Sequence, residues 1–209
     1  FDEQQAAQMR SDAFIEGEGI RIPINAYLVN TGDKLVLIDA GTSGALGPTL
    51  GHLGSALAAA GVSPEQIDAV LITHMHPDHL FGVATAENTK MFPNAELILP
   101  ETDKAFWFDD ANLNAAPDQM KAFFNGARAA ANLYGDRQTL FAGEGELLPG
   151  IRPLSLPGHT PGHYGFVLES NGETLVVAGD ILHFAPYQFA QPDWGIAFDI
   201  DPAIAAATR

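Results

Sequence analysis

The sequence contains no cysteine, which excludes disulfide bonds, thiolate metal ligands and a cysteine nucleophile. Basic residues are also scarce: ten Lys and Arg stand against 26 Asp and Glu, for a formal net charge of −16. A field of that sign repels phosphate backbones, so we expect no nucleic-acid partner. No apolar run approaches the roughly 20 residues that a membrane-spanning helix needs, so we expect no membrane partner. The remaining composition is globular, 46% hydrophobic and 17% charged.

The chain is long enough, at 209 residues, for one substantial core. It begins with Phe1 and shows no signal-peptide pattern, while residues 199–209 read as the beginning of a helix. We therefore expect residues 1–209 to form a single domain that lacks N-terminal and C-terminal segments of the whole protein. The compartment stays open between the cytoplasm and, after removal of an export signal, the periplasm.

Strand and helix patterns alternate along the chain. Residues 26–29 and 34–38 read as two strands around a turn, and a similar pair returns at 166–168 and 174–178. The other predicted elements are helices at 48–60, 63–66 and most of 101–135, and strands at 69–73 and 92–100, after an irregular lead-in over 1–20. Such alternation predicts a mixed α/β chain built from two similar ββ halves.

The most informative stretch is the hexapeptide His-Met-His-Pro-Asp-His at residues 74–79. It directly follows an apolar run typical of a buried strand, and four of its six side chains are ligands for a divalent metal. His74 and His76 can converge on one ion if the loop curls, and Asp78 and His79 would point to a neighbouring position. Imidazole with carboxylate favours zinc, iron, cobalt or manganese over calcium. A low-complexity histidine tract is the alternative, but the flanks are ordinary globular sequence.

Two later stretches complete a set of metal ligands. The Pro/Gly-rich segment Gly158–His163 offers His159 as a third imidazole, and Asp180 follows the last predicted strand. Alone each is weak, because a turn often carries a histidine and an aspartate after a strand commonly caps a helix. Together with residues 74–79 they provide three imidazoles for one ion and a carboxylate that can bridge two.

These three motifs resemble the metal motifs of the metallo-β-lactamase superfamily, and the resemblance implies an αββα sandwich of two ββ-rich halves. It also implies two divalent ions, zinc first, with manganese, cobalt or iron as alternatives. Asp39, in an Asp-x-Gly sequence, would support the site by holding a ligand. The residues that match the superfamily's ligands are His74, His76 and His159 for the first ion, Asp78 and His79 for the second, and Asp180 between both.

A closer resemblance is to the methyl parathion hydrolase and lactonase branch of that superfamily. The phrases that carry it are 27–32, 46–51, 73–79, Asn112-Leu113, 158–163 and Phe189-x-x-Pro192. The branch lines its leaving-group pocket with aromatic residues, and Trp107 and Phe124 fall at matching places. An ordinary helical core is the alternative for both. Leu46 stands where an aromatic residue is expected, and His183 lies close enough to Asp180 to contact substrate.

One departure concerns the second ion. The superfamily adds a further histidine some way after the bridging aspartate, but this sequence ends at Arg209 and His183 follows Asp180 by only three residues. Either that ligand lies beyond Arg209 or the second ion is bound weakly, and we expect the former. His163 is expected to be structural.

Two cations that share a carboxylate would hold a bridging hydroxide, which attacks a carbonyl or phosphoryl centre without a covalent enzyme intermediate. The candidates for a general acid are Asp78, which is the candidate catalytic side chain, and a metal-bound water. We predict a hydrolase of small neutral lactones or aryl esters, with phosphotriesters of the methyl parathion type as further substrates, and the resemblance suggests a homodimer. The alternatives are a metal-binding scaffold without hydrolysis, and another superfamily hydrolase such as a thioesterase, whose acidic substrate would require basic residues that are scarce here.

Overall fold

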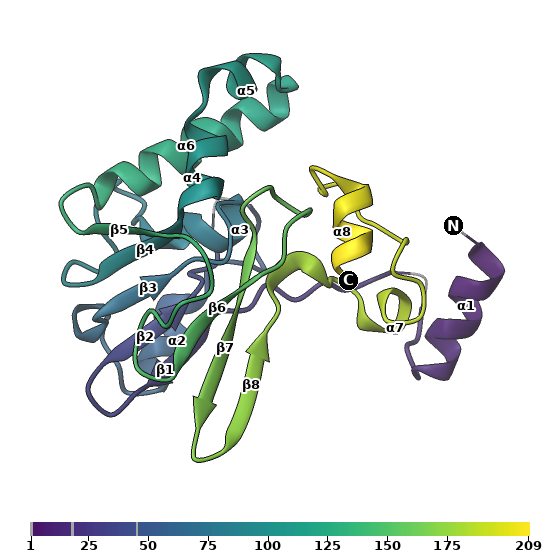
Figure 1. Ribbon diagram of the computed structural model, residues 1–209, viewed down its shortest axis with the longest axis horizontal. Helices are drawn as coiled ribbons and strands as arrows, with labels where there is room; N and C mark the ends of the chain where they lie inside the picture. Colours follow the sequence, from purple (N-terminus) through teal and green to yellow (C-terminus); the bar gives the residue numbers. More distant parts are fainter. Residues whose placement is uncertain (1, 18, 45) are drawn as a thin grey trace.

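The computed structural model describes residues 2–17, 19–44 and 46–209, and within them two β-sheets lie face to face (Figure 1). In the larger sheet β1 and β2 are antiparallel while β2 to β5 run parallel, and the smaller sheet is antiparallel throughout. The larger sheet comprises β1 (Tyr27–Asn30), β2 (Leu35–Ile38), β3 (Ala69–Leu71), β4 (Glu96–Pro100) and β5 (Gln138–Phe141). The smaller comprises β6 (Ile151–Ser155), β7 (Tyr164–Ser170) and β8 (Glu173–Val177).

Helices cover the outer face of the larger sheet and one end of the smaller one. The α-helices are α1 (Glu3–Asp12), α2 (Leu53–Ala59), α3 (Pro77–Leu80), α4 (Glu101–Phe108), α5 (Asp110–Ala115), α6 (Asp118–Leu133), α7 (Ala185–Gln188) and α8 (Pro202–Thr208). Short 3₁₀ turns are η1 (Pro64–Gln66), η2 (Phe81–Val83) and η3 (Gly179–Ile181). The predicted α/β class and αββα sandwich are confirmed, as are both hairpins.

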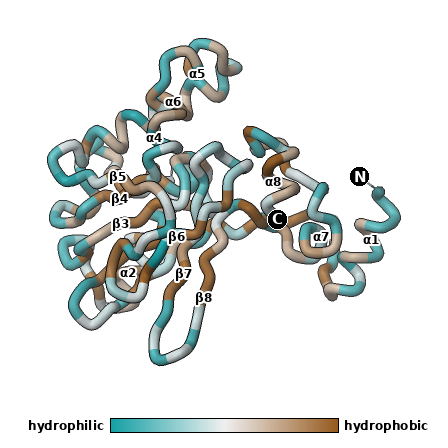
Figure 2. Tube along the Cα trace, viewed as in Figure 1, coloured by the Kyte–Doolittle hydropathy of each residue, from teal (hydrophilic) through white to brown (hydrophobic). Residues whose placement is uncertain are grey.

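The core has two parts because successive side chains of a strand point to opposite faces. Leu37, Val70 and Leu97 face the helical layer and pack with residues of α2, α4 and α6. Val36, Ile38 and their neighbours face the other way and pack against Phe166 and Val177 of the smaller sheet. The brown segments in Figure 2 follow these central strands. The central strands β2, β3 and β4 are therefore buried on both faces, which fits their near-continuous apolar runs.

Two predictions of secondary structure differ from the structure. The helix expected at 48–60 begins only at Leu53, because Gly47 and Gly51 have positive φ values of 139° and 79°. A Cβ at Gly51 would also lie 2.6 Å from the backbone nitrogen of Gly44. The lead-in at 1–20 was wrongly predicted to be irregular: it contains α1, which Asp2 caps by accepting hydrogen bonds from the backbone of Gln4 and Gln5.

The topology brings the chemically informative loops to one edge of the sandwich. β2 and β3 are parallel neighbours, with Ile38 opposite Leu71, so Asp39 and the hexapeptide emerge side by side. The loop between β6 and β7 carries His159, and Asp180 follows β8 on η3. Within the described residues no helix is both long and apolar enough to cross a membrane.

Candidate metal centre

Three histidines from two loops converge on one point. His74 Nε2 lies 3.0 Å from His76 Nδ1, which lies 2.9 Å from His159 Nε2. All three side chains are buried, and their ligand atoms could hold a single ion. We call His74, His76 and His159 the three-histidine cluster.

In His159 and His74 the ring proton can be assigned from the hydrogen bond at Nδ1, the nitrogen that points away from the other two rings. His159 Nδ1 donates to Asp199 over 2.9 Å. Thr73 Oγ1 donates its proton to Asp39 and therefore accepts one from His74 Nδ1, 3.0 Å away. The inward Nε2 atoms of His74 and His159 are then bare lone pairs aimed at His76.

The electrostatics of the three-histidine cluster disfavour its protonation. Burial, followed by the neighbouring His79 and His159, holds the pKa of His74 well below its ordinary value. Burial and His159 do the same to the pKa of His76. A neutral His76 can donate a proton from Nδ1 to only one of the two facing lone pairs, whereas a divalent cation can bind all three nitrogens. This donor set therefore fits a divalent metal.

A second group of ligand atoms gathers around Asp180. His79 Nε2 lies 3.2 Å from Asp180 Oδ1 and 3.7 Å from Asp78 Oδ2. Asp180 Oδ2 lies 3.6 Å from His159 Nε2 and 3.1 Å from His183 Nε2. One carboxylate thus faces both groups, because its Oδ1 lies near His79 and its Oδ2 lies near His159 and His183. Asp180 could therefore bridge an ion in the three-histidine cluster and one beside His79.

The charges at this second group also favour a cation. Burial alone would lower the pKa of His79, but Asp180 and Asp39 raise it well above its ordinary value. Burial alone would raise the pKa of Asp180, but His79 and His183 hold it well below its ordinary value. A positive charge is thus favoured between His79 and Asp180, and either an imidazolium proton or a metal ion can supply it.

Asp39 fixes the start of the hexapeptide. Its backbone is left-handed, with a φ of 58°, and its Oδ1 accepts a 2.8 Å hydrogen bond from the backbone of Thr73. Its Oδ2 lies 2.8 Å from His79 Nδ1, which directs His79 Nε2 toward Asp180. A carboxylate in this position can orient a histidine ligand, which is the role that the sequence analysis predicts for Asp39.

Asp199 makes a similar contact that the sequence analysis missed. Its side chain is fully buried, and besides His159 it contacts the buried guanidinium of Arg209 at 3.4 Å. No local pattern separates Asp199 from Asp201, which caps α8 two residues later. Long-range contacts bring this segment against the loop, among them backbone hydrogen bonds from Ile200 to His159 and from Asp201 to Gly158.

His163 supports the site through hydrogen bonds to two backbone groups. Its Nδ1 donates to the carbonyl of Leu156, and its Nε2 accepts a 2.9 Å hydrogen bond from the backbone of Asp180. Burial, followed by the nearby His159, lowers its pKa to about 3. A neutral His163 therefore holds Asp180 in place.

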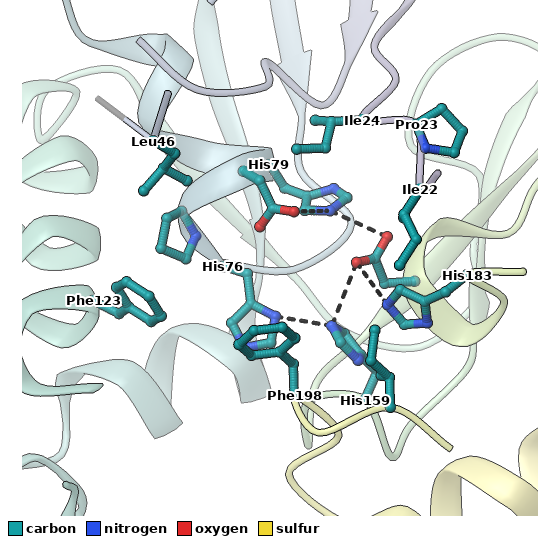
Figure 3. A pocket seen from close by; sticks show the side chains of 14 residues that line it. Ile22, Pro23, Ile24, Leu46, His76, His79, Phe123, His159, His183 and Phe198 are labelled. Atoms are coloured by element: carbon teal, nitrogen blue, oxygen red, sulfur yellow. Dashed lines mark hydrogen bonds and ion pairs between the residues drawn. The ribbon is translucent and has the colours of Figure 1, made fainter. Parts of the chain in front are cut away.

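The two groups form the floor of a cavity of about 360 Å³. Its wall is apolar, and Figure 3 shows Leu46, Phe123 and Phe198 facing the histidines. The lining residues are Ile22, Pro23, Ile24, Leu46, Pro77, Phe123, Ile196 and Phe198 on the wall, with His76, Asp78, His79, His159, Asp180 and His183 on the floor. The cavity suits an apolar molecule whose polar end reaches the floor.

The predicted pocket residues divide into two pairs. Leu46 and His183 lie on the cavity surface as expected. Trp107 and Phe124 instead lie in the helical core, 0% and 2% exposed. Successive residues of a helix point in directions about 100° apart, so Phe123 faces the cavity while Phe124 faces inward. Trp107 packs edge-on against the His76 ring, with centroids 5.3 Å apart. It thus contacts a candidate metal ligand from within the core.

Comparisons with known proteins agree with this fold. The sequence profile described as the metallo-beta-lactamase superfamily matches residues 19–209. The crystal structure of hydrolase AbOPH, of the beta lactamase superfamily, superposes with a TM-score of 0.91 and 34% identity, over 100% of this chain and 73% of that one. AidC, a dizinc quorum-quenching lactonase solved with the product N-hexnoyl-L-homoserine, superposes with a TM-score of 0.86 and 29% identity, over the same shares.

Among curated sequences, the uncharacterized protein YobT of Bacillus subtilis is 29% identical over 161 residues, which are 76% of this chain. This chain spans only 61% of the length of YobT. A sandwich of two sheets with histidine and aspartate clusters at its edge defines a class of metal-binding folds. Within that class, the chain belongs to the metallo-β-lactamase superfamily.

Proposed function

We propose that this chain forms the catalytic core of a metal-dependent hydrolase that cleaves small neutral lactones or aryl esters. The observation that carries the proposal is the carboxylate of Asp180, which two groups of ligand atoms share at the floor of an apolar cavity. The similarity of this chain to AidC, which extends over the whole chain, supports two zinc ions and a lactone substrate. Phosphotriesters with good leaving groups are a further proposed substrate class, and a homodimer is the proposed assembly.

Six residues would hold the two ions. They are His74, His76 and His159 for the first, Asp78 and His79 for the second, and Asp180 for both. Divalent ions bound there would activate a water molecule as the nucleophile and polarise the carbonyl oxygen of the substrate. The residues of this chain would position the ions, form the apolar wall and provide a path for protons.

The cavity lining indicates direct attack by water. Among the described residues that line it there is no Ser, Thr, Cys or Lys, so the side chains offer no alcohol, thiol or amine nucleophile. Asp78 lies at the cavity surface with 31% of its side chain exposed, where it could pass a proton to the leaving oxygen. Phenolate or enolate leaving groups need little such help.

The apolar wall would select the substrate. Leu46, Phe123 and Phe198 can bury an acyl chain or an aromatic ring, and burial of such groups stabilises binding by about 25 cal/mol per Å². A neutral substrate also avoids repulsion by a protein with a net charge of −16. Both features favour lactones and aryl esters over acidic thioesters.

The test is hydrolysis of dihydrocoumarin, an acyl-homoserine lactone and methyl parathion by the natural protein that contains this chain. The protein is first stripped with a chelator and then reloaded with zinc, manganese or cobalt while its metal content is measured. We expect loss of turnover on stripping, recovery with about two equivalents of metal, and faster turnover of the lactones. Bound metal without turnover of any substrate would instead support a metal-binding scaffold.

A further inference from the structure

Two segments of the chain supply the three-histidine cluster. His74 and His76 flank Met75 on the segment after β3, and His159 lies on the loop between β6 and β7. At their bases these segments are joined by a backbone hydrogen bond from Tyr164 to the carbonyl of Thr73. Nearer the cluster, a separate contact is needed to hold one segment against the other.

The side chain of Asp103, in the first turn of α4, makes that contact. Its Oδ2 accepts a 2.6 Å hydrogen bond from the backbone nitrogen of Met75, between the two histidines. Its Oδ1 accepts a 3.3 Å hydrogen bond from the backbone nitrogen of Gly162, three residues after His159. A single carboxylate therefore spans both segments that carry the cluster.

Asp103 is fully buried, and none of the ion pairs among the described residues includes it. Its third partner is the indole of Trp107, which donates to Oδ2 over 3.1 Å and packs edge-on against His76. Burying a carboxylate without a cation is costly, so a charge retained here needs several donors to compensate it. The first turn of α4 adds a favourable dipole.

The chemistry of the three contacts requires a carboxylate. Met75, Gly162 and Trp107 all present N–H donors, and together they occupy both oxygens of Asp103. An asparagine of the same size would turn an NH₂ group toward at least one of these donors. At Gly162 a side chain would collide with the backbone of Asp103, so the loop approaches α4 as closely as a backbone can.

We propose that Asp103 is a positioning residue for the metal centre: its carboxylate sets the distance between the His74–His76 segment and the His159 loop, and thereby the metal affinity of the three-histidine cluster. The inference rests on the proposed metal-dependent function. Asp103 touches neither the cavity nor any of the candidate ligand atoms. It acts instead through the backbone of Met75 and Gly162 and through the indole of Trp107, which packs against His76.

The test compares cobalt binding by Asp103→Asn and by the wild type, in the natural full-length protein after chelator treatment. Competition with a chromophoric chelator gives the affinity, and the visible absorption of bound cobalt reports the ligand geometry. We expect Asp103→Asn to bind cobalt at least tenfold more weakly, the lower end of the range for partners that orient metal ligands, with an altered spectrum.

Tyr134→Phe is the matched control. The Tyr134 hydroxyl is also buried and makes two backbone contacts, donating to Val83 and accepting from Phe92, but it does not reach the His159 loop. We expect this variant to lose stability and to bind cobalt within twofold of the wild type. Equal weakening in both variants, or wild-type affinity in a folded Asp103→Asn protein, would overturn the inference.

Amide exchange of the metal-free wild type provides a second measurement if Asp103→Asn does not fold. If Asp103 sets the spacing before metal binds, the amides of Met75 and Gly162 are protected together in the absence of metal. Rapid exchange of both amides would contradict the inference. A wild type that binds no cobalt would overturn the proposed function as well, whereas a wild type that binds normally while these tests fail overturns the role of Asp103 alone.

Discussion

At the scale of single residues, the candidate metal centre is defined by which nitrogen of each histidine is left free. Asp39 takes Nδ1 of His79, and Asp199 takes Nδ1 of His159, so in both rings Nε2 is the atom that faces inward. A carboxylate on the far nitrogen also raises the basicity of the ligand nitrogen. The two aspartates lie in unrelated parts of the chain and perform the same task.

A matched pair of variants tests this role for Asp199. Replacing Asp199 with Asn removes the charge beside His159, and we expect metal affinity to fall about tenfold. Asp201→Asn makes the same chemical change two residues away, and asparagine caps a helix as well as aspartate, so metal affinity should not change. Calorimetric titration of both chelated variants with zinc measures the difference. Equal affinities would show that Asp199 serves only to pair Arg209.

At the scale of elements, α6 shows how one helix divides its work between the core and the cavity. Phe123 and Phe124 are neighbours in sequence, but Phe123 lines the cavity and Phe124 packs among buried side chains of α4 and the larger sheet. The sequence pattern predicts a helix with an aromatic face. It does not predict where the cavity wall ends and the core begins.

Alanine variants of these two residues should separate the two roles. Phe124→Ala leaves a cavity in the core and should lower the free energy of unfolding by about 3–5 kcal/mol. Phe123→Ala should cost less stability but raise KM for an aryl ester, with kcat little changed, because it removes apolar contact with the substrate. Denaturant melts and steady-state kinetics measure both effects. A larger stability loss for Phe123→Ala would contradict the assignment.

At the scale of the whole molecule, the buried histidines couple the fold to pH. The pKa of His163 falls to about 3 in the folded chain, chiefly because of burial, against an ordinary value of 6.5. Between these values the unfolded chain binds a proton that the folded chain does not. Stability supplied by neutral His163 is therefore complete above pH 6.5 and falls as the pH drops toward 3.

His163→Gln tests this coupling in the chelated protein. One proton changes the free energy of unfolding by about 1.4 kcal/mol per pH unit. Between pH 6.5 and 3, the free energy of unfolding of the variant should therefore depend on pH less steeply than that of the wild type, by about that amount. His52→Gln, at the exposed start of α2, should leave the slope unchanged. Urea melts at half-unit pH intervals provide the measurement. The coupling through His163 would be refuted if the free energies of unfolding of wild type and His163→Gln changed equally with pH.

The class of fold, both hairpins and the residues proposed as metal ligands could be predicted from the sequence. These features are local: apolar periodicity selects strands and helices, and the hexapeptide at 74–79 places its potential ligands within six residues. His159 and Asp180 could be found because each occurs in a recognisable turn. The structure then brings their side chains together with His74, His76 and His79.

Which side chains support that centre, and which line the cavity, depends on how the folded chain packs. Asp103 and Asp199 look like ordinary helix-end carboxylates in sequence. The backbone partners of Asp103 lie 28 and 59 residues away, and His159 lies 40 residues from Asp199. Phe123 and Phe124 cannot be told apart by composition. Burial and long-range hydrogen bonds arise from how the two sheets and the helical layer pack, and local sequence preferences carry no record of that packing.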